Sequence, residues 1–104
     1  MIVFSKDWQA FDFESLEIGD SIVSLSPSKF QPEEGKKASD AIITFEGGQV
    51  RYRFDGGDPS PSLDGGHLGE SGLVLTLKNP FDIAQFKAIR AGSENGRIQV
   101  TYRR

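Results

Sequence analysis

Short strand-like runs, separated by Gly, Pro and Asp, constrain the fold of this sequence more than any other feature. Helical periodicity is nearly absent, whereas residues 50–54 alternate strictly, with apolar side chains on one face and two arginines on the other. Further runs of this kind lie at residues 21–26, 41–45, 73–78, 86–91 and 98–102. Six to eight short strands with turn signals at this spacing predict an all-β fold, an antiparallel β-sandwich or jelly roll.

Two pairs of these runs predict β-hairpins. Within residues 41–54 the pair Gly47-Gly48 separates two apolar runs, and such a pair supplies the positive φ angles of a tight turn. We expect this hairpin to be central, with Tyr52 and Phe54 buried. The sequence GSENG separates the runs 86–91 and 98–102 in the same way and predicts a second hairpin.

The remaining segments read as connections. Residues 27–37 are rich in charge and Pro and predict a loop, with Phe30 fixing it to the core. Residues 55–72 form a long connection of Gly, Pro, Ser and Asp. The pair Asn79-Pro80 suits a helix cap and first turn, so we expect a single helical turn at 81–85 before the strand that follows.

The length of 104 residues predicts one domain, spanning 1–104, with an acidic N-terminal segment at 1–19 that carries Trp8, Phe11 and Phe13. These rings are either tucked into the edge of the domain or anchors for a partner. Cysteine is absent, which excludes disulfides, thiolate nucleophiles and Cys-based metal motifs. The first residues do not resemble a secretory signal and no apolar run suits a membrane span, so we expect no membrane association.

Charge is unevenly distributed along the chain. The net charge of −3 gives nucleic-acid binding no overall electrostatic support. Residues 1–34 hold seven acids and two lysines, a balance of −5, whereas residues 76–104 hold six bases and two acids, a balance of +4. Two interpretations remain open: solvated strand faces that happen to differ, or complementary edges that join identical subunits.

The loop at 55–72 contains Asp55, Asp58 and Asp64, whose carboxylates could form a weak Ca²⁺ site. Their spacing does not match the EF-hand pattern. Asp-Gly is also among the commonest turn pairs, because Asp bonds its own backbone and Gly takes the positive φ. We therefore interpret these acids mainly as turn formers, with the ion site as the weaker alternative.

Catalytic motifs are missing from the sequence. His67 is the one histidine, and no Gly-x-Ser-x-Gly elbow accompanies it, so we interpret it as a loop residue at the entrance of a strand. Arg51 and Arg53 lie on the strand face opposite Tyr52, whereas RNA-binding sheets place basic and aromatic residues together. We expect no catalysis, no cofactor and no nucleic-acid binding.

The sequence resembles a family of small proteins of tailed bacteriophages and prophages, typically encoded among head and tail genes. The resemblance is carried by the order of three stretches: SIVSLSPSKF, AIITFEGGQVRYRFDGGDPSPSLDGGHL and DIAQFKAIRAGSENGRIQVTYRR. It leaves the acidic N-terminal segment outside. Ser60 stands where the family pattern has Thr, and the second Asp-Gly-Gly lengthens the turn.

This resemblance implies a virion structural protein: a head-decoration, head–tail or tail component that is assembled in the bacterial host cytoplasm. Its expected partners are other capsid or tail proteins and further copies of itself, without a small-molecule ligand. The residues expected at such interfaces are Trp8, Phe11, Phe13, Arg51, Arg53, Arg90 and Arg103. An alternative function is a carbohydrate-binding β-sandwich that uses the 55–72 loop, with or without Ca²⁺.

Overall fold

A computed structural model describes residues 9–33 and 37–104 of the chain, and β-strands dominate them. The strands in this part are β1 (Ala10–Ile18), β2 (Val23–Ser24), β3 (Asp40–Gly47), β4 (Val50–Arg53), β5 (His67–Gly69), β6 (Val74–Leu77), β7 (Lys87–Arg90) and β8 (Gly96–Arg103). Two short helices, α1 (Pro27–Phe30) and α2 (Pro80–Gln85), accompany them. Neither is long and apolar enough to cross a membrane. The predicted all-β class is confirmed.

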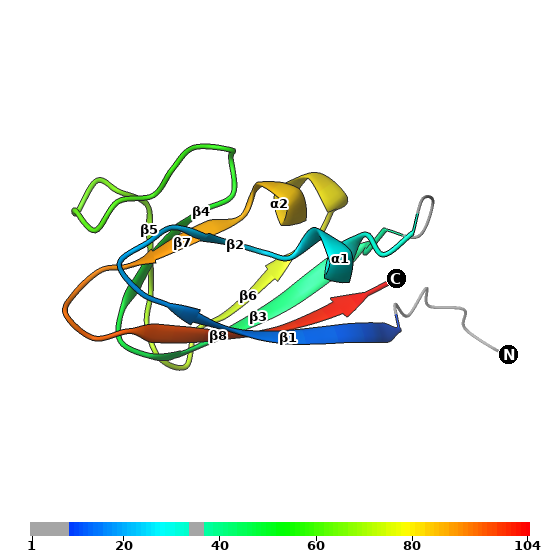
Figure 1. Ribbon diagram of the computed structural model, residues 1–104, viewed down its shortest axis with the longest axis horizontal. Coiled ribbons are helices and arrows are strands. Elements are labelled where there is room, and N and C mark those ends of the chain that lie inside the picture. Colours follow the sequence, from blue (N-terminus) through cyan, green and yellow to red (C-terminus); the bar gives the residue numbers. More distant parts are fainter. Residues whose placement is uncertain (1–8, 34–36) are drawn as a thin grey trace, which may run out of the picture.

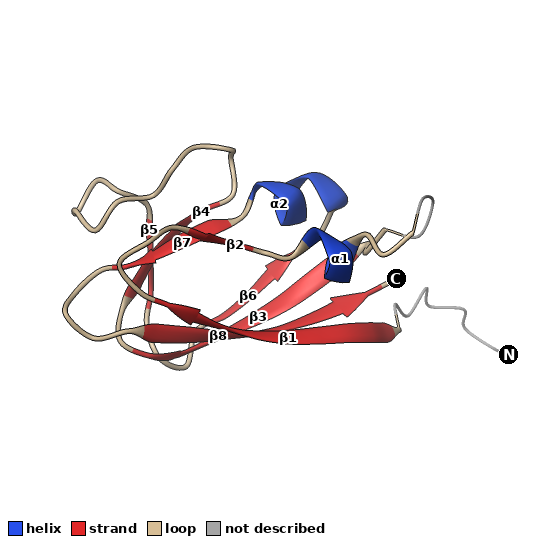
Figure 2. Ribbon diagram, in the orientation of Figure 1, coloured by secondary structure: helices blue, strands red, loops and turns tan. Residues whose placement is uncertain are grey.

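The strands form two antiparallel four-stranded sheets that pack face to face (Figures 1 and 2). One sheet has the order β1-β8-β3-β6 and the other has the order β2-β7-β4-β5. Both helices lie toward the end of the sandwich where the C-terminus lies (Figure 1). The backbones of Gln9 and Arg104 exchange two hydrogen bonds of 3.0 Å at that end.

The strand pairing is nested. β1 pairs with β8, β2 with β7, β3 with β6 and β4 with β5, as in one long antiparallel ribbon folded over on itself. The further pairs β3–β8 and β4–β7 then join the folded ribbon into two sheets. The predicted antiparallel β-sandwich is confirmed, and its nested pairing is that of a jelly roll.

Both predicted hairpins are wrong, although their strands exist. β3 and β4 lie in different sheets, and so do β7 and β8. The two turns pack against each other instead: Gly47 adopts φ 74°, and the N–H of Gly48 donates to the carbonyl of Asn95 at 3.0 Å. A Cβ on Gly48 would lie 2.3 Å from the carbonyl oxygen of Glu94, so the Gly-Gly pair here permits a close approach between two crossovers.

The acidic N-terminal segment holds a strand that the sequence pattern did not reveal. β1 pairs with β8 along most of its length, and Glu17 lies opposite Arg97. The acidic and basic stretches of the chain are therefore neighbours within one sheet rather than separate patches.

The connections largely follow the expectations. The side chain of Asn79 accepts a hydrogen bond of 2.9 Å from the N–H of Asp82 and caps α2, which precedes β7 as predicted. Phe30, on α1 within the expected loop, is buried. The long connection after β4 differs from the prediction, because β5 forms inside it and pairs with β4.

The core lies between the two sheets. Tyr52 is buried as predicted, whereas Phe54 is only half-buried, so that part of the prediction is wrong. Phe54 follows the last residue of β4 and stacks on the edge of the core, with its ring 6.4 Å from that of Tyr52. The largest fully buried side chains include Tyr102, Phe45 and Phe86.

The two tyrosines of the chain, Tyr52 and Tyr102, predict an alkaline transition. Burial raises the pKa of both phenols, and the Glu14 carboxylate raises that of Tyr102 further. The stability that the buried, neutral phenols contribute is fully present below the pKa of tyrosine in the unfolded chain, about 10. This contribution is lost as the pH rises above that value. We expect phenolate absorbance to rise together with loss of the circular dichroism signal. Gradual ionisation near pH 10 in a folded protein would contradict this burial.

Candidate association surface

The loop after β4 begins with an ion pair between neighbours. The guanidinium of Arg53 donates to both carboxylate oxygens of Asp55, at 3.0 Å from Nε and 2.7 Å from Nη2. The N–H of Gly57 donates to the same carboxylate at 3.1 Å. These bonds, with that from Arg53 the strongest influence, lower the pKa of Asp55 to about 2. Arg53, one of the residues expected at an interface, thus makes its bidentate pair within the chain.

The other two loop acids have different surroundings. Asp58 forms an ion pair of 2.9 Å with Lys87 on β7, and Asp64 is exposed. Ser60 and Gly65 close the tip of the loop through a backbone hydrogen bond of 2.9 Å. In residues 9–33 and 37–104, no three His, Cys, Asp or Glu residues lie together in a way that could hold a metal ion.

Calcium therefore has little to bind in this loop, and we expect millimolar Ca²⁺ to leave the melting temperature unchanged. Two of the three carboxylates already have cationic partners, and Ca²⁺ would have to displace them. A bound ion would raise the melting temperature by mass action. Thermal melts with Ca²⁺ and with Mg²⁺ as the control measure this, and a rise specific to Ca²⁺ would contradict the expectation.

His67 lies at the start of β5, as expected for a residue at a strand entrance. Its exposed ring stacks on Phe54, with centroids 5.8 Å apart and an interplanar angle of 21°. Ser60 and Ser62 hydrogen-bond each other at 3.0 Å. A hollow of about 320 Å³ adjoins the ring, lined by Arg53, Asp55, Leu63, Asp64, Gly66 and His67.

The remaining arginines expected at interfaces also have partners within the chain. Arg51 donates to the carbonyl of Gly66 at 3.3 Å, and Arg90 donates to the side chain of Asn95 at 2.8 Å. Arg103 forms a bidentate pair with the buried Asp40, at 2.8 and 2.5 Å.

The three aromatic residues expected at an interface have different places. Trp8 lies outside the described residues. Phe11 is half-buried against Tyr102, under the guanidinium of Arg104 at 4.1 Å from the ring centre. Phe13 is 51% exposed on β1. Of the two described rings, Phe13 is therefore the one that the structure presents to a partner.

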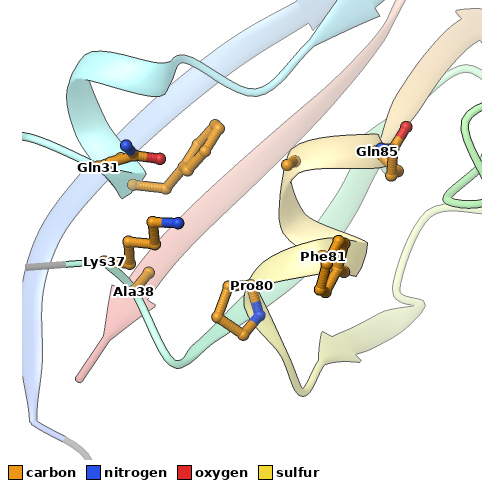
Figure 3. Close-up of a pocket in the computed structure, with 8 residues that line it drawn as sticks. Gln31, Lys37, Ala38, Pro80, Phe81 and Gln85 are labelled. Carbon is orange, nitrogen blue, oxygen red and sulfur yellow. The ribbon is translucent and has the colours of Figure 1, made fainter. Parts of the chain in front are cut away.

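A second hollow, of about 200 Å³, lies between α1 and α2. Gln31, Lys37 and Ala38 line one side, and Pro80, Phe81 and Gln85 line the other (Figure 3). Phe81 is 80% exposed at its rim. Among the described residues that line this hollow, Lys37 is the one ionisable side chain.

The outer face of the β1-β8-β3-β6 sheet carries two rows of uncharged side chains. Alternate residues of β8, namely Ile98, Val100 and Tyr102, are buried inward, so the residues between them face outward. The strand register then gives the rows across all four strands: Phe13, Thr101, Ile42 and Thr76 in one, and Ser15, Gln99, Thr44 and Val74 in the other. We call these eight residues the open face.

Charge borders the open face at both ends. Glu17, Arg97 and Glu46 lie across the sheet beyond one row, and the pair Asp40–Arg103 lies beyond the other. Phe13 and Val74, at opposite edges, are 51% and 59% exposed. An uncharged centre with a charged rim is the usual anatomy of a protein–protein interface.

Sequence reasoning found Phe13 but missed the rest of the open face. The available signal was the lack of charge at the outward positions of 42–44, 74–76 and 99–101. Such positions are ordinary in isolation and become a surface only when the register aligns them.

Comparison with known proteins gave no match to a family model, a curated protein or a solved structure.

Proposed function

We propose that this protein is a structural component of a bacteriophage or prophage virion that acts by protein–protein association. The open face carries the proposal, because it is an uncharged, partly apolar sheet surface with exposed Phe13 and Val74. Two further points support it. The sequence resembles small phage proteins, and the jelly roll is an architecture that many viral capsid proteins use.

Association follows from the chemistry of this surface. An aromatic anchor such as Phe13 contributes most when a partner removes it from water, and the bordering charges mainly set orientation and rate. Because this chemistry needs neither a catalytic residue nor a cofactor, we infer a role without enzymatic activity. The partners on this proposal are capsid or tail proteins, in a head-decoration, head–tail or tail position, and the protein resides in the virion after assembly in the host cytoplasm.

Incorporation into particles tests the proposal. The double variant Phe13→Ser, Val74→Ser should be produced and folded but lost from particles purified after induction of the phage. Leu63→Ser is the matched control, because Leu63 is 82% exposed and lies on the loop, away from the open face. Particles that never contain the wild-type protein would refute the virion role. Particles that retain the double variant would refute the role of the open face.

Carbohydrate binding is a second candidate function, favoured by the hollow beside His67. An exposed ring next to polar groups such as Arg53 and Asp64 suits a sugar, which places its apolar face on a ring and its hydroxyls on charged side chains. A glycan array with wild type and His67→Ala tests this function. Binding that depends on His67 would favour it over the virion role.

A further inference from the structure

The free edge of β1 differs from the other sheet edges in length. β1 has nine residues, whereas the outer strands β2, β5 and β6 have two, three and four. Short edges resist pairing with another chain, but a long edge presents a row of unpaired backbone groups. In the part of the chain that the structure describes, residues 10–18 make no backbone–backbone hydrogen bond outside their pairing with β8.

The register shows which backbone groups are free. Gln9 and Arg104 exchange both of their backbone hydrogen bonds, so alternate residues of β8 before Arg104 direct their backbones toward β1. Tyr102, Val100 and Ile98 are these residues. Their partners are Asp12, Glu14 and Leu16, which leaves the N–H and C=O groups of Phe13, Ser15 and Glu17 facing away from the sheet.

The start of this edge is protected and its second half is open. The register shifts between Ala10 and Asp12, and the side chain of Asp12 accepts the N–H of Phe13 at 2.8 Å. Bulges and local side-chain bonds of this kind keep an edge from pairing. Within residues 9–33 and 37–104, no side chain accepts a hydrogen bond from the N–H of Ser15 or of Glu17.

We infer that β1 pairs antiparallel with β1 of a second copy, about a two-fold axis at Leu16. Ser15 of each copy then lies opposite Glu17 of the other, and each pair exchanges the free backbone hydrogen bonds. The Asp12–Phe13 bond is preserved. The two β1-β8-β3-β6 sheets become one continuous eight-stranded sheet. This inference deepens the proposed function and rests on it, because the dimer presents two open faces side by side.

Charge complementarity favours a second copy over an unrelated strand. Arg97 donates to Ser15 Oγ at 2.9 Å, which holds its guanidinium at the edge of the sheet, and the described residues give it no carboxylate in ion-pair contact. The carboxylate of Glu17 accepts from the amide of Asn95 at 3.1 Å. In the dimer, Glu17 of the second copy lies directly opposite Ser15, with the two Cβ atoms about 4.5–5.5 Å apart. Its carboxylate therefore reaches the guanidinium that is bonded to Ser15. The axis generates this ion pair twice.

Proline at position 15 tests the pairing. Ser15→Pro removes an N–H that has no acceptor among the described residues, and proline is tolerated at that position of an edge strand. Ser15→Ala keeps the N–H and is the matched control. We expect wild type and Ser15→Ala to be dimers by light scattering at about 100 µM, and Ser15→Pro to bind about tenfold more weakly or worse. A monomeric wild type, or a folded Ser15→Pro that remains as dimeric as Ser15→Ala, would overturn the inference.

Cysteine cross-linking tests the register and does not depend on the proline variant folding. The chain has no cysteine, so each introduced thiol is the sole one. An equimolar mixture of Ser15→Cys and Glu17→Cys should form a disulfide faster than either variant alone, because only the mixed pair lies within disulfide range. Ser93→Cys, which places its thiol in the exposed turn before β8, is the control. If the mixture forms disulfides no faster than this control, the inference is overturned. Particle incorporation remains a separate measurement, so the dimer and the virion role can fail independently.

Discussion

Phe45→Ala should lower the free energy of unfolding by about 3–5 kcal/mol, the usual cost of removing a buried Phe side chain. Phe45 is 2% exposed and joins the two layers. It belongs to β3 in one sheet, while its ring lies 5.3 Å from that of Tyr52 on β4 in the other. A Cβ on Gly69 of β5 would lie 2.6 Å from the ring, so the surroundings are closely fitted and would collapse poorly around a cavity.

Urea denaturation of two control variants calibrates this loss. Phe81→Ala removes the same ring from a site that is 80% exposed, and we expect a change below about 0.5 kcal/mol. Phe54→Ala, at the half-buried end of β4, should fall between the two. A Phe45→Ala loss no larger than that of Phe54→Ala would show that Phe45 does not fill the space between the sheets.

Glu14→Ala should be the second most costly substitution, with a loss of about 2–4 kcal/mol. Glu14 is 9% exposed on the inner side of β1. Its carboxylate accepts from the hydroxyl of Tyr102 at 2.5 Å, from Ser26 Oγ at 2.6 Å and from the N–H of Ser26 at 3.1 Å. Alanine would leave these donors buried or half-buried without their acceptor. It would also remove the hydrogen bonds that hold Ser26, the residue before α1, against β1.

In melts at protein concentrations too low for the β1–β1 pairing, Glu17→Ala is the matched control, because Glu17 lies on the same strand with its side chain exposed. We expect it to change stability by less than about 0.5 kcal/mol. Tyr102→Phe removes one of the donors and keeps the ring, so its loss should be about 1.5–3 kcal/mol, the value of a hydrogen bond to a charged group. If urea denaturation gives Glu14→Ala and Glu17→Ala the same free energy of unfolding, the buried carboxylate of Glu14 does not stabilise the sandwich.

The candidate sites were predictable to different degrees. The turn-forming role of Asp55 follows from the local sequence Asp-Gly-Gly, and the structure shows its carboxylate bonded to the N–H of Gly57. Its cationic partner, Arg53, is two residues away, whereas Lys87, the partner of Asp58, is 29 residues away. The open face combines four strands that are distant in sequence, so only Phe13 could be chosen beforehand.

The sequence by itself determined where most strands lie and which side chains they bury. Alternation over 50–53 is a local property with a period of two, and it specifies a buried face without reference to any partner. The cap at Asn79 and the turn at Gly47-Gly48 are local as well. These features were readable because the residues that cause them are neighbours in the chain.

Tertiary structure alone decided which strands pair. Backbone hydrogen bonds are nearly independent of side-chain identity, so a Gly-Gly turn between two alternating runs fits a hairpin and a crossover between sheets equally well. The choice depends on β8, which takes its place between β1 and β3. β1 escaped prediction for a related reason. Its inward positions include Asp12 and Glu14, which are acceptable there only because Lys29, Ser26 and Tyr102, distant in sequence, supply their hydrogen bonds.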